Sequence, residues 1–195
     1  MQTFQRSLML LFLVPFLAYA QYGVSFTVSR GNPTIKWIHS TQAVEASFRH
    51  AMTKQWTLGI LSGYEELVLN RRGYEANMIP IVASLRYFTA ESGTRGYFEV
   101  QGGLVWRKFD FSVMQQDPLS PGAFVTVGKS TIKHLAPQYS LGAGISLPAL
   151  SKVSVDFGLQ IDVSPKGLSY SNVSDETLPD GFSQTRLLVG AHYSF

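Results

Sequence analysis

The stretch VSVDFGLQIDV, residues 153–163, alternates apolar and polar side chains without a break. Successive side chains of a β-strand point to opposite faces, so the valines share one face with Phe157 while Asp156 and Asp162 lie on the other. A helix repeats every 3.6 residues and would not hold these apolar side chains together. Residues 186–195 alternate in a similar way. This pattern predicts strands that are apolar on one face only.

Eight segments of the chain alternate like this, each bounded by residues typical of turns or loops. They are residues 22–29, 41–51, 55–69, 77–89, 96–113, 131–147, 152–164 and 183–195. The connections between them alternate in length. The short ones are 52–54, 90–95 and 148–151, and the long ones are 30–40, 70–76, 114–130 and 165–182. The sequence therefore predicts an antiparallel sheet with tight turns at one end and loops at the other.

The first twenty residues are typical of an export signal. Arg6 is followed by an apolar run over residues 8–17 and by the small-residue site Ala18-Tyr19-Ala20. A membrane anchor helix is the alternative, but it would need about 20 apolar residues. We therefore predict a signal peptide over residues 1–20, cleaved before Gln21, and a single domain over residues 21–195.

The composition limits the classes of function. The chain has 195 residues and no cysteine, so it can form neither a disulfide nor a thiolate metal site. Its net charge of +3 is too small to indicate nucleic-acid binding. No phosphate-binding loop, zinc-protease helix or nucleophile elbow occurs. His39 and His50 have no second ligand at a suitable spacing, so we predict no metal site and no cofactor.

The two faces of the predicted strands differ in an unusual way. The apolar faces carry large, uncharged side chains, whereas the polar faces carry glycine, serine and few lysines. A soluble sandwich would place many lysines and glutamates outside, so small polar residues are better suited to a narrow interior. Only a closed barrel satisfies every backbone group in lipid. We predict an all-β fold, an eight-stranded antiparallel transmembrane β-barrel, with outward aromatics near both membrane borders.

The chain resembles the small eight-stranded outer-membrane barrels of Gram-negative bacteria, the OmpA/OmpX type. The resemblance rests on the export signal, the eight strands and the final segment LLVGAHYSF, residues 187–195. It implies an outer-membrane location with both termini in the periplasm and contact with outer-membrane lipid. It also implies that Tyr193 and Phe195 form the signal read by the barrel-assembly machinery. We expect no periplasmic domain, because the chain stops at Phe195.

Charged residues also occur on the face that points into the predicted barrel. Eight strands leave an interior just wide enough for side chains to fill, and buried charges must be paired. We interpret these residues as a salt-bridge network that closes the lumen; a proton or ion relay is the alternative. By strand position, the half nearer the turns holds Glu45, Arg49, Arg86, Glu99, Asp156 and His192, and the half nearer the loops holds Glu65, Arg107, His134, Asp162 and Arg186.

An enzymatic function is the second hypothesis. The segment His192-Tyr193-Ser194 is similar to the His-x-Ser pair of lipid A deacylases, which act on the lipid-facing wall near the outer leaflet. Here His192 and Ser194 share the lumenal face at the turn end, so the match is poor. We therefore predict no catalytic residues.

The long connections carry exposed apolar residues, which are candidates for recognition because binding residues concentrate on loops held by a rigid scaffold. They are Ile35, Trp37, Ile38 and Phe124. For Trp37 and Ile38, extension of a strand above the membrane is the alternative. The predicted function is a non-enzymatic outer-membrane barrel with a structural or surface-interaction role through its external loops, or a subunit of an envelope assembly. The candidate partners are a surface ligand and an envelope protein. A lipid-modifying enzyme and a narrow channel are the alternatives.

Overall fold

A computed structural model describes residues 21–34, 38–69, 74–116, 124–165, 168–169 and 181–195. All regular secondary structure in these residues is β-strand. The strands are β1 (Gln21–Pro33), β2 (Ile38–Ala51), β3 (Trp56–Leu69), β4 (Tyr74–Phe88), β5 (Arg95–Gln116), β6 (Phe124–Leu150), β7 (Val153–Ser164), β8 (Leu168–Ser169) and β9 (Phe182–Ser194). None of the described residues forms a helix long and apolar enough to cross a membrane.

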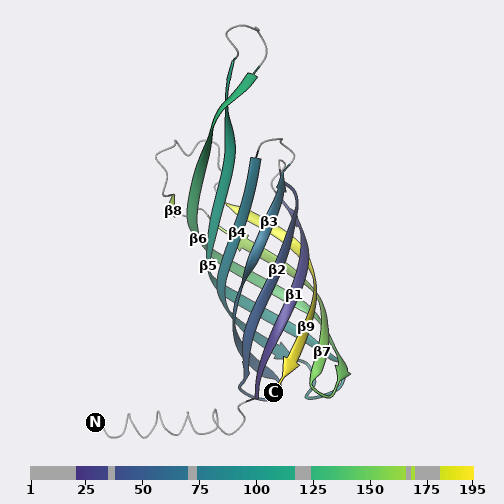
Figure 1. Ribbon diagram of the computed structural model, residues 1–195. Helices are drawn as coiled ribbons and strands as arrows, with labels where there is room; N and C mark the ends of the chain where they lie inside the picture. Colours follow the sequence, from purple (N-terminus) through teal and green to yellow (C-terminus); the bar gives the residue numbers. More distant parts are fainter. Residues whose placement is uncertain (1–20, 35–37, 70–73, 117–123, 166–167, 170–180) are drawn as a thin grey trace, which may run out of the picture.

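In the described part of the chain, eight long strands close into a ring (Figure 1). Each pairs antiparallel with the next along the chain, β7 pairs with β9, and β9 returns to β1, where Val24 lies opposite Tyr193. The two-residue β8 pairs with β6 at His134 and Leu135, beyond the end of β7. The predicted eight-stranded antiparallel barrel is confirmed. We call the end with the short connections the turn end and the opposite end the hairpin end.

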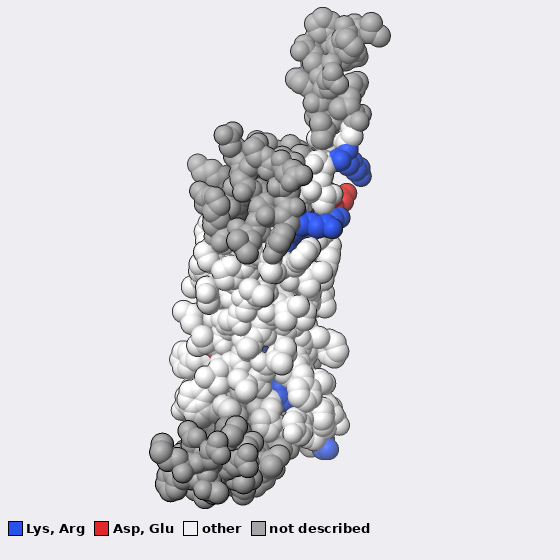
Figure 2. Space-filling view, turned by 90° about the vertical axis from the view of Figure 1, so that its left-hand side faces the viewer, with Lys and Arg blue, Asp and Glu red and all other residues white. Residues whose placement is uncertain are grey.

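The two faces of the strands have the predicted orientation. Along β7, Asp156, Gln160 and Asp162 are buried in the lumen, whereas Phe157 and Leu159 are 47% and 58% exposed on the outer wall. On the face of the barrel that Figure 2 shows, the middle of the outer wall is almost free of charged side chains. The interior is therefore polar and the exterior apolar, the reverse of a soluble protein.

Strands β5 and β6 are longer than the sequence predicts. The sequence predicts a loop over residues 114–130, but the paired strands continue to Gln116 and resume at Phe124. They form a hairpin that extends beyond the other strands (Figure 1). The segment Phe-Val-Thr-Val, residues 124–127, explains the difference, because aromatic and β-branched residues favour strands.

The lumen also contains an apolar layer near the hairpin end. Its side chains lie on the inward face, because Met78 pairs in register with the buried Arg107. The sequence predicts a polar interior and does not anticipate this layer. The buried members are Ile38, Leu67, Ala76, Met78, Val105, Ala136 and Phe182. Apolar packing therefore adds to the charged groups in filling the barrel.

Candidate functional site

The lower part of the lumen holds an ion-paired group that we call the turn-end cluster: Arg49, Arg86, Glu99 and Asp156. Arg86 Nη2 lies 2.6 Å from Glu99 Oε2, and Arg86 Nη1 lies 2.5 Å from Asp156 Oδ2. Arg49 Nη2 lies 3.3 Å from Glu99 Oε1. All four residues are buried, and they come from β2, β4, β5 and β7. Two arginines and two carboxylates thus neutralise each other across the barrel.

The upper part of the lumen holds the hairpin-end cluster: Arg186, Glu45, Glu65 and Asp162. Arg186 Nη1 lies 2.5 Å from Glu45 Oε1, and Arg186 Nε lies 2.6 Å from Asp162 Oδ2. Glu65 Oε2 is more distant, 4.0 Å from Arg186 Nη1. Gln184 Nε2 donates hydrogen bonds to Glu65 at 2.7 Å and to Asp162 at 3.0 Å. One guanidinium and one amide therefore hold three carboxylates.

The two clusters contain eight of the eleven residues that the sequence places in the lumen, with one change of position. Glu45 does not belong to the half nearer the turns; it contacts Arg186 in the hairpin-end cluster. Glu45 and Arg49 are four residues apart on β2, which at about 3.3 Å per residue separates them by about 13 Å. Two layers of charge follow from this spacing.

Contrary to the prediction, Arg107 belongs to neither cluster. Its side chain is buried, but no carboxylate lies within ion-pair distance among the described residues. Its Nη2 donates to the Ser164 carbonyl at 3.4 Å, and its guanidinium lies 5.6 Å from the centre of the Phe182 ring. Ion pairing across the lumen depends on which strands face each other. The alternation of side chains along a single strand does not contain this information.

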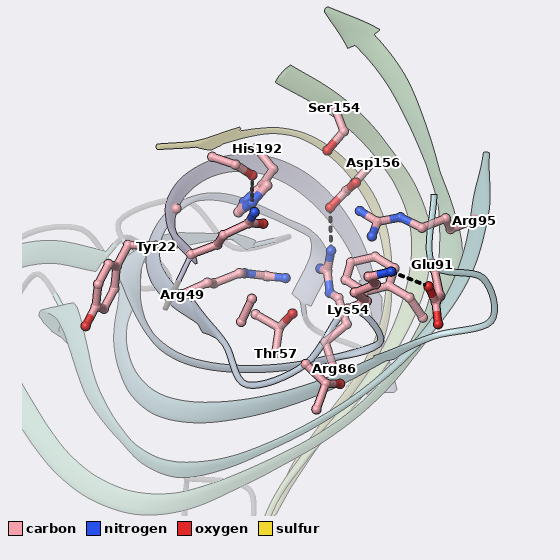
Figure 3. Close-up of a pocket in the computed structure, with 16 residues that line it drawn as sticks. Tyr22, Arg49, Lys54, Thr57, Arg86, Glu91, Arg95, Ser154, Asp156 and His192 are labelled. Carbon is pink, nitrogen blue, oxygen red and sulfur yellow. Dashed lines mark hydrogen bonds and ion pairs between the residues drawn. The ribbon is translucent and has the colours of Figure 1, made fainter. Parts of the chain in front are cut away.

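A cavity of about 140 Å³ opens at the turn end, and we call it the vestibule. Figure 3 shows Arg49, Arg86, Asp156 and His192 around it. At its rim the Arg95 guanidinium lies 3.8 Å from the centre of the Phe88 ring. The exposed pair Lys54–Glu91, with 2.8 Å between Nζ and Oε2, also lines it. The vestibule ends at the turn-end cluster, which separates it from the rest of the lumen.

The vestibule contains an arrangement that resembles a nucleophile with its base. Ser194 Oγ lies 3.1 Å from His192 Nε2, within hydrogen-bond distance. His192 Nδ1 has no hydrogen-bond partner in the described part of the chain. A serine triad needs a carboxylate on that nitrogen to fix the tautomer and the orientation of the ring. This geometry supplies a polar pair but lacks the third member of a triad.

The predicted recognition residues have different positions. Ile38 is buried in the apolar layer, with 4% exposure, so its side chain is not presented to a ligand and this prediction is wrong. Phe124 begins strand β6 and does not lie in a loop. Ile35 and Trp37 lie outside the described residues. Ile38 has the same parity as the exposed Val44, so strict alternation would place it on the outer face. The register shift between Ile38 and Ser40 turns its side chain inward, and the alternation of the sequence does not reveal that shift.

The predicted assembly-signal residues lie at the turn end of β9. Tyr193 and Phe195 are 43% and 55% exposed, and their ring centres are 6.1 Å apart. Tyr22 on β1 lies beside them, with its ring centre 6.5 Å from that of Phe195. The resemblance to outer-membrane barrels implies recognition of this pair, which stays a prediction.

Comparison with solved structures identifies the fold. The Neisserial surface protein A structure matches with a TM-score of 0.59 and 12% identity over 90% of this chain and 97% of that chain. Ail, the attachment invasion locus protein of Yersinia pestis, matches with a TM-score of 0.57 and 10% identity over 90% of this chain and 99% of that chain. A major outer membrane protein from Thermus thermophilus matches with a TM-score of 0.52 and 13% identity over 88% of this chain and 99% of that chain.

The chain therefore has the fold of the small eight-stranded outer-membrane barrels. No protein-family model matches the sequence, and no curated protein matches it. At these low sequence identities the comparison establishes the fold alone. The role of the protein must be inferred from its own residues.

Proposed function

We propose that this protein is a non-enzymatic barrel of the outer membrane, closed to solutes, that acts through the β5–β6 hairpin at its exposed end. The observation that carries the proposal is the hairpin itself. The backbone pairing of β5 and β6 continues from Asp110–Thr131 to Gln116–Phe124, beyond the apolar outer wall. A paired extension of this length is not needed to span a membrane, for which about 9–11 residues per strand suffice.

The filled lumen supports a scaffold and argues against a channel. The turn-end cluster, the hairpin-end cluster and the apolar layer occupy successive levels of the interior. The large outward side chains and the matching folds of outer-membrane proteins support insertion in that membrane, with the turn end in the periplasm. The incomplete His192–Ser194 pair supports a role other than catalysis.

The test removes the hairpin and leaves the barrel intact. Asp110 and Thr131 are directly opposite each other, so an Asn-Gly turn can replace residues 111–130 and close the two strands. A control variant with Lys54→Gln and Glu91→Gln changes exposed residues at the opposite end. Surface cross-linking on intact cells, followed by purification in mild detergent, compares both with the wild type.

We expect the wild type and the control to retain a cross-linked partner and the shortened variant to lose it while still folding. Folding is checked by heat-dependent gel mobility. A shortened variant that folds and retains the same partner would contradict the proposal. A change in lipid A composition that depends on His192 or Ser194 would favour the enzyme instead.

A further inference from the structure

The outer wall near the hairpin end carries an apolar groove. Its volume is about 410 Å³, and every residue that lines it is apolar. The side chains come from three adjacent strands, β4, β5 and β6, and at the centre Trp106 is 40% exposed. The lining residues are Ile79, Ile81, Leu104, Trp106 and Leu135. The indole N–H of Trp106 is the one hydrogen-bonding group among these lining side chains, so the groove is suited to a hydrocarbon chain.

Two lysines lie directly beyond this groove. Trp106 pairs in register with Leu135, and two residues further along both strands Lys108 pairs with Lys133. Lysines opposite each other on neighbouring strands repel, which destabilises the pair unless an anion lies between them. Lys129 follows on the same face, opposite Ser112. Figure 2 shows basic side chains gathered above the uncharged part of the wall.

One carboxylate partly compensates this group. Asp110 accepts hydrogen bonds of 2.5 Å from both Lys108 Nζ and Thr131 Oγ1. The hydrogen bond from Lys108 is the main reason that the pKa of Asp110 lies below its ordinary value, so the group stays charged. Lys129 and Lys133 are exposed and form no ion pair among the described residues. The surface therefore keeps an excess of positive charge.

We propose that this surface, the groove with Lys108 and Lys133, is a docking site for an anionic membrane lipid, one whose headgroup phosphate is not neutralised by a cationic group. The acyl chain lies along the groove, and the phosphate lies between the two ammonium groups. The proposal rests on the membrane insertion described above, but not on the role of the hairpin.

Charge complementarity selects this occupant. A phosphate offers anionic oxygens to the ammonium groups, each of which has three donors. A headgroup that ends in a cationic choline would bring a third positive charge to the lysines. A soluble acidic peptide would satisfy the lysines but would leave the groove open. An anionic phospholipid satisfies both because its uncompensated phosphate is attached at the end of its hydrocarbon chains.

Tryptophan fluorescence can report the lipid at this site. A variant with Trp37→Phe and Trp56→Phe keeps Trp106 in the groove, and a variant with Trp37→Phe and Trp106→Phe keeps Trp56 at the turn end. Trp56 is 41% exposed on the same apolar wall and is therefore a matched control. Each protein is placed in vesicles of phosphatidylcholine that contain a quencher lipid. The quencher is brominated phosphatidic acid in one sample and brominated phosphatidylcholine in the other, at the same mole fraction.

We expect brominated phosphatidic acid to quench Trp106 more strongly than brominated phosphatidylcholine and to quench Trp56 no more strongly. Lys108→Gln and Lys133→Gln should each lower the preference at Trp106 about 5-fold, the effect expected for one lysine near a charged membrane surface. Lys133→Arg should keep the preference, and Asp110→Asn should increase it. Both glutamine substitutions change the exposed rim of the barrel and leave the lumen intact.

Equal quenching of Trp106 by the two lipids would overturn the proposal. A preference that survives both glutamine substitutions, or that occurs equally at Trp56, would overturn it as well. If brominated phosphatidylcholine quenches neither tryptophan, membrane insertion itself is wrong. Loss of the lipid preference with normal quenching would leave the proposed role of the hairpin intact.

Discussion

Arg86 Nη1 lies 2.5 Å from Asp156 Oδ2, although β5 and β6 separate their strands in the ring. The contact between β4 and β7 therefore crosses the lumen. Arg86 also binds Glu99 on the neighbouring strand β5 and stacks over Tyr97, with 4.0 Å from its guanidinium carbon to the ring centre. One side chain thus connects three strands of the barrel and fills the space between them.

Arg86→Met should lower the free energy of unfolding by about 3–5 kcal/mol, because it leaves Glu99 and Asp156 buried with fewer partners. Arg107→Met is a matched control, since both arginines are 6% exposed and Arg107 has no ion pair in the described residues. The control should be neutral or stabilising. The free energy of unfolding of both variants is measured by titration with urea. The loss of the heat-dependent shift in gel mobility is the signal for unfolding. Equal destabilisation by the two substitutions would contradict the claim that the ion pairs of Arg86 stabilise the barrel.

The purified protein should give no stable conductance in planar bilayers, because two layers of ion pairs and the apolar layer fill an interior of minimal width. Shortening both Arg86 and Arg186 to alanine should admit ions, since these two side chains occupy the centres of the two clusters. A reproducible open state in the wild type would make the channel the better hypothesis.

Glycine at position 158 makes room for the Tyr97 ring. A Cβ built on Gly158 would collide with the hydroxyl of Tyr97. Gly158→Ala should therefore cost about 1–3 kcal/mol, the usual effect of overpacking, and Tyr97→Phe should recover part of this cost. Gly103→Ala is the control, because its Cβ would meet the Val82 Cα at 2.7 Å and no change at Tyr97 can relieve that contact. Additive costs for Gly158→Ala and Tyr97→Phe in a double-mutant cycle would contradict this packing.

The barrel itself could be predicted because its strands are amphipathic. The alternation around Phe157 places that residue on the lipid face, and the antiparallel order follows from the alternating connections. The ends of the strands were harder to predict. Residues 124–127 favour a strand, but Pro118 and Pro121 nearby indicate a loop. Both prolines lie outside the described residues, and the pairing resumes at Phe124, where the strand-favouring segment begins.

The partners inside the lumen could be predicted only in part. Arg86 and Glu99 are neighbours because their strands are joined by a short turn. By contrast, Glu45 meets Arg186 because the last strand closes on the first, and this closure determines which walls face each other. Arg107 shows the same limit: its inward orientation could be predicted, but its lack of an ion pair with any of the described residues could not.

Labelling of cysteines on intact cells tests the central claim, a barrel of the outer membrane with its hairpin outside. The chain has no native cysteine, so Lys129→Cys on the hairpin and Lys54→Cys at the turn end each provide one reactive site. A membrane-impermeant maleimide should modify position 129 on intact cells and position 54 only after the outer membrane is opened. Modification of position 54 on intact cells, with position 129 protected, would contradict the account.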